Sequence, residues 1–357
     1  MRVGFLIPQV MNIGGAEPWL IALLKGLADR VRLVGVAVKT VLPIDEATRG
    51  VIARYCPVYT DSDAVGRVAP HCDVLVTWGT QHHLHEHLDG FRRPGLKVVL
   101  VAHSVRPFCC GQAHEERADA LVAVSRTAKA FFPEAARDRV EVIHPGVDPD
   151  RCVPSRPRAE LRAFYGYGPD DKVVGFLGRF SAEKNPLTVT SAVPTLGPGW
   201  HAFMVGEGGL RRQVEQSVDD LPYGRHLVVP TVSHVGDALA VMDCLVVPSQ
   251  YETFCLSTVE AWMAGVPVVM TPVGVRMDLE PLHGPLTVPI PYNPTPMTLA
   301  DAIRQATHPA FSGIVHKARH MAWERLNHAY AARRWIGYMA GLLNPETKHD
   351  TSNDAPA

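Results

Sequence analysis

Two carboxylates eight positions apart, Glu252 and Glu260, are the most informative candidates for chemistry in this sequence. They lie in the segment PSQYETFCLSTVEA, which follows an apolar run and predicts a helix capped by Ser257 or Thr258. The change from loop to helix lets both carboxylates face one cleft. A carboxylate in the loop suits sugar hydroxyls, and one near the helix start suits the two hydroxyls of a ribose. Alternatively, Glu252 is solvated and Glu260 only favours the helix dipole.

Two cationic residues form the second candidate. Arg179 and Lys184 are five positions apart in GRFSAEKN, a segment that starts with Gly178 and leads to Pro186, a favoured first residue of a helix. Such a loop can place two cations against one diphosphate. A solvated turn with ordinary surface charges fits the spacing equally well.

Two glycine-rich turns also precede predicted helices. Gly14-Gly15 comes directly before Ala16 and Glu17, and Gly206-Glu207-Gly208 follows another apolar run. Small residues allow the backbone N–H groups at a helix start to approach a phosphate closely. Taken alone, each is more simply a tight turn.

Apolar, β-branched runs alternate with helical stretches throughout the chain, which predicts an α/β protein with parallel sheets buried on both faces. In the first half we expect strands at Val3–Pro8, Val31–Val38, Val74–Trp78, Val98–Ala102, Ala120–Val124 and Val140–Ile143, with a helix at about Ala16–Ala28. In the second half we expect strands at Val173–Leu177, Ala202–Val205, Leu227–Val229, Leu245–Val247 and Val266–Met270. The helices between them are expected at 186–193, ended by Pro194, and at Leu210–Leu221, Val235–Met242 and Ser257–Ala264.

A length of 357 residues exceeds what one core usually supports, and a proline-rich stretch over Arg151–Pro157 predicts a linker. We therefore expect two doubly wound domains, 1–150 and 151–327. The last helical segment, roughly Ile314–Leu343, is expected to kink, so that a helix at about 328–344 packs back on the first domain. The polar tail, 345–357, is expected to be disordered.

The composition excludes several classes of function. A net charge of −1 gives no electrostatic footprint for nucleic acid or for an anionic membrane. The seven cysteines show neither metal-type nor disulfide-type spacing, and the first apolar run reads as a strand rather than a signal peptide, so we expect a cytoplasmic protein. No run of roughly 18 apolar residues predicts a membrane span.

The histidine-rich segment QHHLHEH, residues 81–87, invites a metal interpretation. His83 and His87 are four positions apart with Glu86 between them. Because no further set of ligands is identifiable, we prefer a polar loop or surface helix on the acceptor side, and we expect no metal.

These motifs together resemble the large retaining glycosyltransferase family 4, whose members have the GT-B fold of two Rossmann-like domains facing a cleft. The most specific element is the Glu252-x7-Glu260 pair followed by AWMAGVPVV. The supporting motifs occur in the family's order and are Gly14-Gly15-Ala16-Glu17, His103, Ser125, His144-Pro145-Gly146-Val147-Asp148, Gly178-Arg179, Lys184 and Gly206-Glu207-Gly208. The resemblance covers nearly the whole chain.

The resemblance implies a nucleotide diphosphate-sugar donor, transfer to an acceptor hydroxyl, and no cofactor. Arg179 and Lys184 would neutralise the leaving diphosphate, Glu252 would bind the transferred sugar, and Glu260 would bind the ribose. His103 would lie near the reaction centre, and we prefer this interpretation to that of a buried structural histidine. The remaining donor contacts would come from Gly14, Gly15, Gly178, Gly206, Glu207, Phe254, Cys255, Leu256 and Thr258.

Two departures from the family pattern bear on specificity. Family members often have glycine where this chain has Thr253 and Cys255, and Pro18 stands where a cationic residue is common.

The acceptor is expected to contact loops of the first domain, with candidate contacts at Trp78, His82, His83, Arg106 and Phe108. A soluble small molecule or natural product is the expected acceptor, and a lipid-linked or cell-surface glycan is the alternative. A GT-B nucleotide-sugar epimerase and a non-catalytic nucleotide-sugar-binding subunit are alternatives of other classes.

Overall fold

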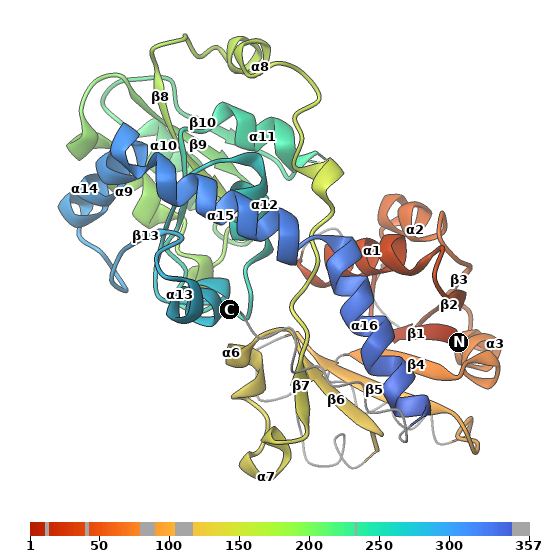
Figure 1. Ribbon diagram of the computed structural model, residues 1–357. Helices are drawn as coiled ribbons and strands as arrows, with labels where there is room; N and C mark the ends of the chain where they lie inside the picture. Colours follow the sequence, from red (N-terminus) through yellow and green to blue (C-terminus); the bar gives the residue numbers. More distant parts are fainter. Residues whose placement is uncertain (11–13, 40–42, 79–89, 104–116, 233, 345–357) are drawn as a thin grey trace. The chain divides into compact units, whose positions relative to one another are not determined.

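The computed structural model describes residues 1–10, 14–39, 43–78, 90–103, 117–232 and 234–344 (Figure 1). The chain divides into two compact units: Met1–Val147 with Leu326–Ala357, and Asp148–Arg325. Each unit is built on a parallel sheet, as the alternating apolar runs predict. No helix in the described part of the chain combines the length and apolarity needed to cross a bilayer.

The first unit contains a seven-stranded parallel sheet in the order β3-β2-β1-β4-β5-β6-β7. Its strands are β1 (Arg2–Ile7), β2 (Arg32–Val38), β3 (Val58–Tyr59), β4 (Val74–Trp78), β5 (Lys97–Ala102), β6 (Ala120–Ala123) and β7 (Val140–Val142). Phe5, Leu6 and Ile7 of the inner strand β1 are fully buried, as expected for a parallel sheet covered by helices. These helices are α1 (Ala16–Leu27), α2 (Glu46–Ile52), α3 (Ala64–Val68), α6 (Arg126–Lys129), α7 (Glu134–Arg137) and α16 (His328–Leu343).

The long C-terminal helical segment forms two helices, α15 (Ser312–Arg325) and α16. The break between them agrees with the expected kink. Asn327 begins the second of them, and its side chain accepts a hydrogen bond from the N–H of Tyr330 at 2.8 Å. In the first unit α16 lies beside α1 (Figure 1). The approach is so close that a Cβ on Gly26 would lie 2.6 Å from the His328 carbonyl oxygen.

The second unit contains a six-stranded parallel sheet in the order β10-β9-β8-β11-β12-β13. Its strands are β8 (Lys172–Leu177), β9 (Trp200–Val205), β10 (Leu227–Val229), β11 (Cys244–Val247), β12 (Val268–Met270) and β13 (Val288–Pro289). The first strand, β8, pairs with both β9 and β11, so the order of winding reverses between β8 and β11. In open α/β sheets, ligands bind beyond the carboxyl ends of the strands at this reversal.

Two groups of helices accompany this sheet. The helices α9 (Leu187–Leu196), α10 (Arg211–Asp219) and α14 (Pro296–Thr307) share one core with the strands. The others are α8 (Arg158–Tyr165), α11 (Val235–Val241), α12 (Leu256–Ala264), α13 (Val275–His283) and α15. Phe180 and Phe203 are among the largest fully buried side chains, and Phe180 belongs to this core.

Two predicted helix boundaries are wrong. α9 runs through Pro194 to Leu196, because a proline in the last turn removes only its own N–H, and Gly197 at φ 95° ends the helix instead. α12 is preceded by Cys255 at its N-cap position, with no side-chain cap, rather than by Ser257 or Thr258. Its start is set by the left-handed backbone of Cys255, at φ 75°.

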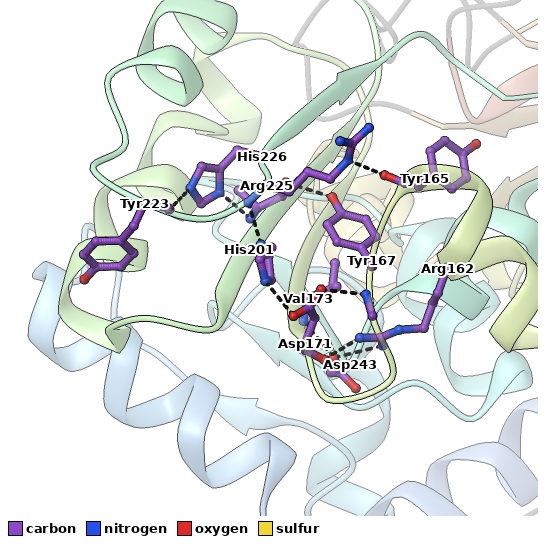
Figure 2. A network of polar contacts seen from close by, with 12 residues as sticks. Arg162, Tyr165, Tyr167, Asp171, Val173, His201, Tyr223, Arg225, His226 and Asp243 are labelled. Carbon is purple, nitrogen blue, oxygen red and sulfur yellow. Dashed lines mark hydrogen bonds and ion pairs between the residues drawn. The ribbon is translucent and has the colours of Figure 1, made fainter.

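A network of polar side chains supports the amino-terminal edge of the second sheet (Figure 2). His226 Nδ1 accepts a hydrogen bond from the Ala202 N–H at 3.0 Å, and its Nε2 faces the Tyr223 carbonyl oxygen. His201 Nδ1 accepts from the Arg225 N–H at 2.7 Å. The Nδ1 of His226 therefore carries no proton, and the ring proton lies on Nε2.

We predict that the free energy of unfolding falls as the pH drops from 7 to 5, and that His226→Gln flattens this dependence. Burial, partly opposed by the Tyr223 carbonyl and reinforced by His201, lowers the pKa of His226. The unfolded chain binds its proton near pH 6.5, whereas the folded chain binds it only at lower pH. The stability contribution is therefore present above pH 6.5 and is lost below it. Urea unfolding at several pH values checks this.

The matched control is His320→Gln, which removes an exposed histidine of α15. An unchanged pH slope in His226→Gln, equal to that of His320→Gln, contradicts the assignment.

Candidate functional site

An ion pair joins the loops that follow β8 and β11, the two strands where the winding of the second sheet reverses. Lys184 Nζ lies 2.5 Å from Glu252 Oε1, and Ser249 Oγ donates to the same oxygen at 2.9 Å. The two charged side chains are only 24% and 8% exposed. A cation and a carboxylate thus meet where open α/β sheets bind ligands.

The loop after β8 also carries the second predicted cation. Arg179 Nη1 lies 3.9 Å from Glu183 Oε1, and the Arg179 side chain is 43% exposed. The Gln250 N–H donates to the Glu183 carbonyl oxygen at 2.8 Å, which ties this loop to the one that carries Glu252. Arg179 and Lys184 therefore share one loop, with Lys184 inward and Arg179 facing solvent.

The electrostatics of the pair favour a charged lysine. Burial opposes the charge on Lys184, but the Glu252 carboxylate, its hydrogen bond and the nearby Cys255 outweigh burial and raise the pKa of the ammonium group. Burial and the negative field of Glu252 raise the pKa of the Cys255 thiol to about 11. At neutral pH the site therefore holds a lysine cation beside a neutral thiol.

The backbone of Cys255 is left-handed, with φ 75°, a conformation that favours glycine. This explains why a glycine suits the position, and it means that the cysteine is held against a local preference. Its thiol accepts a hydrogen bond from Thr258 Oγ1 at 3.2 Å and lies 3.4 Å from Ser257 Oγ. The Cβ and the thiol occupy space beside the Lys184–Glu252 pair that a glycine would leave open.

Close backbone contacts fix the loop that carries Glu252. The Val275 N–H donates to the Phe254 carbonyl oxygen at 2.7 Å, and Thr271 Oγ1 donates to the Ser249 carbonyl oxygen at 2.6 Å. Gly274, at φ 57°, approaches so closely that an added Cβ would lie 2.6 Å from the Phe254 oxygen and 2.9 Å from the Glu252 Cβ.

The two glycine-containing loops of the second unit pack against each other. The Phe180 N–H donates to the Glu207 carbonyl oxygen at 2.7 Å. A Cβ on Gly206 would lie 1.9 Å from the Gly178 carbonyl oxygen, so position 206 requires glycine, whereas a Cβ on Gly178 would make only ordinary contact with the Phe176 ring. The Glu207 side chain pairs with Arg211 at 2.5 Å. Gly206 thus helps to shape the loop that carries Arg179.

Glu260 lies on α12 in a different environment from Glu252. Arg151 Nη2 lies 3.4 Å from Glu260 Oε1, and the Glu260 side chain is 8% exposed. Burial raises the pKa of this carboxyl, and Arg151 opposes the rise. Arg151 and Ser249 also belong to the site, and neither was predicted from the sequence. Arg151 lies in the stretch predicted to be a linker, and only its distance to Glu260 in the folded chain reveals the Arg151–Glu260 pair.

The first unit places its candidates in two groups. Gly14 and Gly15 are exposed directly before α1, as a phosphate-binding turn requires. His103 and Trp78 pack with Trp19, with ring centroids 4.4 Å apart for Trp19–His103 and 5.3 Å for Trp19–Trp78. Burial lowers the pKa of His103 to about 3, so its imidazole is neutral at physiological pH.

Trp78 is only 5% exposed, which limits the surface that it offers to an acceptor. The other four acceptor-side candidates, and the histidine-rich segment, lie outside the described residues. These candidates are His82, His83, Arg106 and Phe108.

Comparisons with known proteins identify the family of the second unit. Residues 157–309 match the family model described as glycosyl transferases group 1. These residues form a group 1 glycosyltransferase domain. The resemblance to glycosyltransferase family 4 is thereby confirmed, and the matched range contains Arg179, Lys184, Glu252 and Glu260.

Two named glycosyltransferases are similar in sequence to part of this chain. The chain is 35% identical over 148 residues to a D-inositol 3-phosphate glycosyltransferase of Mycolicibacterium smegmatis, and 31% identical over 168 residues to that of Mycobacteroides abscessus. These alignments cover 39% and 45% of this chain but only 34% and 36% of the relatives, so the chain spans about a third of their length.

Solved structures are similar over nearly the whole chain. Anabaena HepE in complex with UDP-glucose gives a TM-score of 0.77 at 20% identity, and covers 96% of this chain and 100% of that one. WaaG, a glycosyltransferase of lipopolysaccharide biosynthesis, gives 0.65 at 16% identity, with 96% and 99% covered. The two parallel α/β sheets of this chain therefore match the GT-B fold.

We predict that Gly274→Ala lowers the free energy of unfolding by about 1 kcal/mol or more, because alanine is strained at positive φ and the new Cβ meets the Glu252 loop. Gly313→Ala is the matched control. An added Cβ there meets nothing within 4 Å in α15, so alanine should be neutral or stabilising. Urea unfolding measures both, and equal midpoints contradict the role given to Gly274.

Proposed function

We propose that this chain is a retaining glycosyltransferase that moves a sugar from a nucleotide diphosphate to a hydroxyl group of an acceptor. The observation that supports this most is the Lys184–Glu252 pair, 2.5 Å apart, on loops at the reversal point of a sheet in a group 1 glycosyltransferase domain. A cation for a phosphate and a carboxylate for a sugar stand side by side there.

The reaction breaks the bond between the anomeric carbon and the diphosphate oxygen, and the electron pair stays on that oxygen. The acceptor hydroxyl oxygen forms the new bond to the anomeric carbon from the donor's own face. Its proton goes to a phosphate oxygen of the leaving group. Negative charge thus builds on the diphosphate, where Lys184 and Arg179 stabilise it. Preorganised side-chain cations provide this stabilisation without a metal, so we propose a metal-independent enzyme.

The remaining residues bind the donor. Both side-chain contacts of Glu252 among the described residues use Oε1, which leaves Oε2 to accept from a sugar hydroxyl. The backbone of Phe254, Cys255 and Leu256, at the start of α12, is suited to bind sugar and phosphate oxygens. Glu260 would accept from the ribose hydroxyls.

The resemblance to glycosyltransferase family 4 also implies roles for residues of the first unit. Gly14 and Gly15 would supply backbone N–H groups to the diphosphate from the turn before α1. The neutral imidazole of His103 would lie near the reacting carbon, where it can exchange hydrogen bonds without adding a competing positive charge.

For the acceptor we propose a soluble, hydroxyl-rich small molecule. The similar proteins of Mycolicibacterium smegmatis and Mycobacteroides abscessus are named for D-inositol 3-phosphate, an acceptor of this kind. A glycan attached to a lipid is the alternative, and the similarity of the fold to WaaG favours it.

We predict that Lys184→Ala and Glu252→Gln each lower kcat/KM by roughly 100-fold or more, because each removes a group that stabilises the transition state. Donors labelled in the sugar are tested with UDP, GDP, dTDP and ADP as the nucleotide, in the presence of EDTA. Release of the nucleotide diphosphate and retention at the anomeric carbon are followed. Slow hydrolysis of the donor is expected when no acceptor is supplied.

Lys172→Ala is the control, because Lys172 is exposed at the opposite end of β8. Full activity in Lys184→Ala overturns the proposed role. A sugar inverted at C2 would indicate an epimerase, and tight donor binding without turnover would indicate a binding subunit.

A further inference from the structure

Arg151 is the nearest charged partner of Glu260 among the described residues. Its Nη2 lies 3.4 Å from Glu260 Oε1, and the two residues are 109 positions apart in the chain. Glu260 is buried on α12, and Arg151 ends the short helix η3 (Pro149–Arg151) directly after the start of the second unit. Folding thus brings the first residues of this unit against the second carboxylate of the site.

We propose that Arg151 is a positioning residue that keeps Glu260 ionised and oriented toward the ribose, and thereby sets a preference for ribonucleotide over 2′-deoxyribonucleotide donors. The inference rests on the proposed function, and it assigns a new task to a residue outside the donor-binding motifs.

Local packing holds Arg151 in this position. The Asp148 side chain accepts from the Asp150 N–H at 3.2 Å, which starts η3. Cys152, the next residue after Arg151, is buried with its Sγ 3.9 Å from Met263 Sδ. Met263 lies three positions after Glu260 in α12, so both are on the same side of that helix. Cys152 therefore anchors the segment, and Arg151 reaches Glu260 beside it.

The Arg151 side chain is more buried than in an ordinary surface ion pair. Its side chain is 29% exposed, yet Nε is fully buried and has no hydrogen-bond partner in the described part of the chain. A buried donor without a partner is costly unless a ligand or water satisfies it. The inner part of the guanidinium is thus buried beside Glu260, while the side chain stays partly exposed.

The charge of Arg151 matters because Glu260 is buried. Burial raises the pKa of Glu260, and Arg151 supplies the opposing charge. The neighbouring Cys152 thiol also lies within the field of Glu260, and burial raises its pKa above its usual range, so it stays neutral. An ionised carboxylate offers charged oxygens to both ribose hydroxyls, whereas a protonated one turns one oxygen into a donor and accepts only weaker, uncharged hydrogen bonds.

Isothermal titration calorimetry with the full chain tests this. UDP, GDP and ADP are each compared with their 2′-deoxy forms at pH 7.5, and the ribonucleotide that binds the wild type most tightly is carried forward. The wild type should prefer the ribo form by about tenfold or more, the effect of one hydrogen bond to a charged group. Arg151→Met should reduce this ratio several-fold, and Arg151→Lys should retain most of it.

Dependence on pH separates this role from a structural one. In Arg151→Met the ribose preference should recover as the pH rises from 6 to 9, because higher pH ionises Glu260 without help. In the wild type it should stay flat over this range. A structural role would instead weaken both nucleotides equally at every pH. Arg156→Met is the matched control, because Arg156 is exposed in the same segment, over the Phe164 ring.

Two further variants keep the test decisive. Glu260→Gln should reduce the ribose preference by itself, and Arg151→Met added to it should cause no further reduction. Arg151→Gln replaces Arg151→Met if circular dichroism shows that the latter is unfolded. A wild type that prefers ribose, with an unchanged ratio in the Arg151 variants, overturns the inference and leaves the proposed function intact. A wild type that binds ribo and 2′-deoxy forms equally well also overturns the inference and leaves the proposed function intact. A wild type that binds no nucleotide overturns both the inference and the proposed function.

Discussion

The candidate site depends on a pair of opposite charges held out of water. Lys184 and Glu252 come from loops after adjacent strands, and each satisfies the other at 2.5 Å while little of either is exposed. Removing one would leave an uncompensated charge in a buried place, which costs several kcal/mol in proteins generally. The two loops are therefore coupled, and the Gln250 N–H reinforces this through the Glu183 carbonyl oxygen. In the proposed function, a diphosphate would offer Lys184 negative charge and the sugar hydroxyls would offer Glu252 hydrogen bonds.

Unusual backbone geometry keeps these loops in place. Gly206 and Gly274 lie where any Cβ would collide with a neighbouring carbonyl oxygen, and Cys255 has a conformation that glycine prefers. Strain of this kind persists only where the surrounding structure enforces it, and it is common at functional sites. The thiol of Cys255 adds bulk beside the pair, so this departure from the family pattern lies where the sugar would bind. Under the proposed function, specificity for the donor and stability of the loop would both depend on Cys255.

Much of the fold was predictable from the sequence because buried parallel strands are continuous apolar runs. Lys184 and Glu252 were also found, since each follows such a run. What could not be predicted depends on contacts between distant segments. Arg151 lies in a proline-rich stretch that looked like a linker, and its partner Glu260 is 109 residues away. The cap of α12 was missed because the tertiary contacts of Cys255, rather than a side-chain cap, set its start.

A crystal structure of the chain with an unreactive nucleotide diphosphate-sugar tests the central claim most directly. The account predicts that Lys184 Nζ lies within hydrogen-bond distance, about 3 Å, of a phosphate oxygen, and that Glu252 accepts a hydrogen bond from a hydroxyl of the sugar. A nucleotide sugar bound elsewhere, with the Lys184–Glu252 pair intact and touching no ligand, would contradict it.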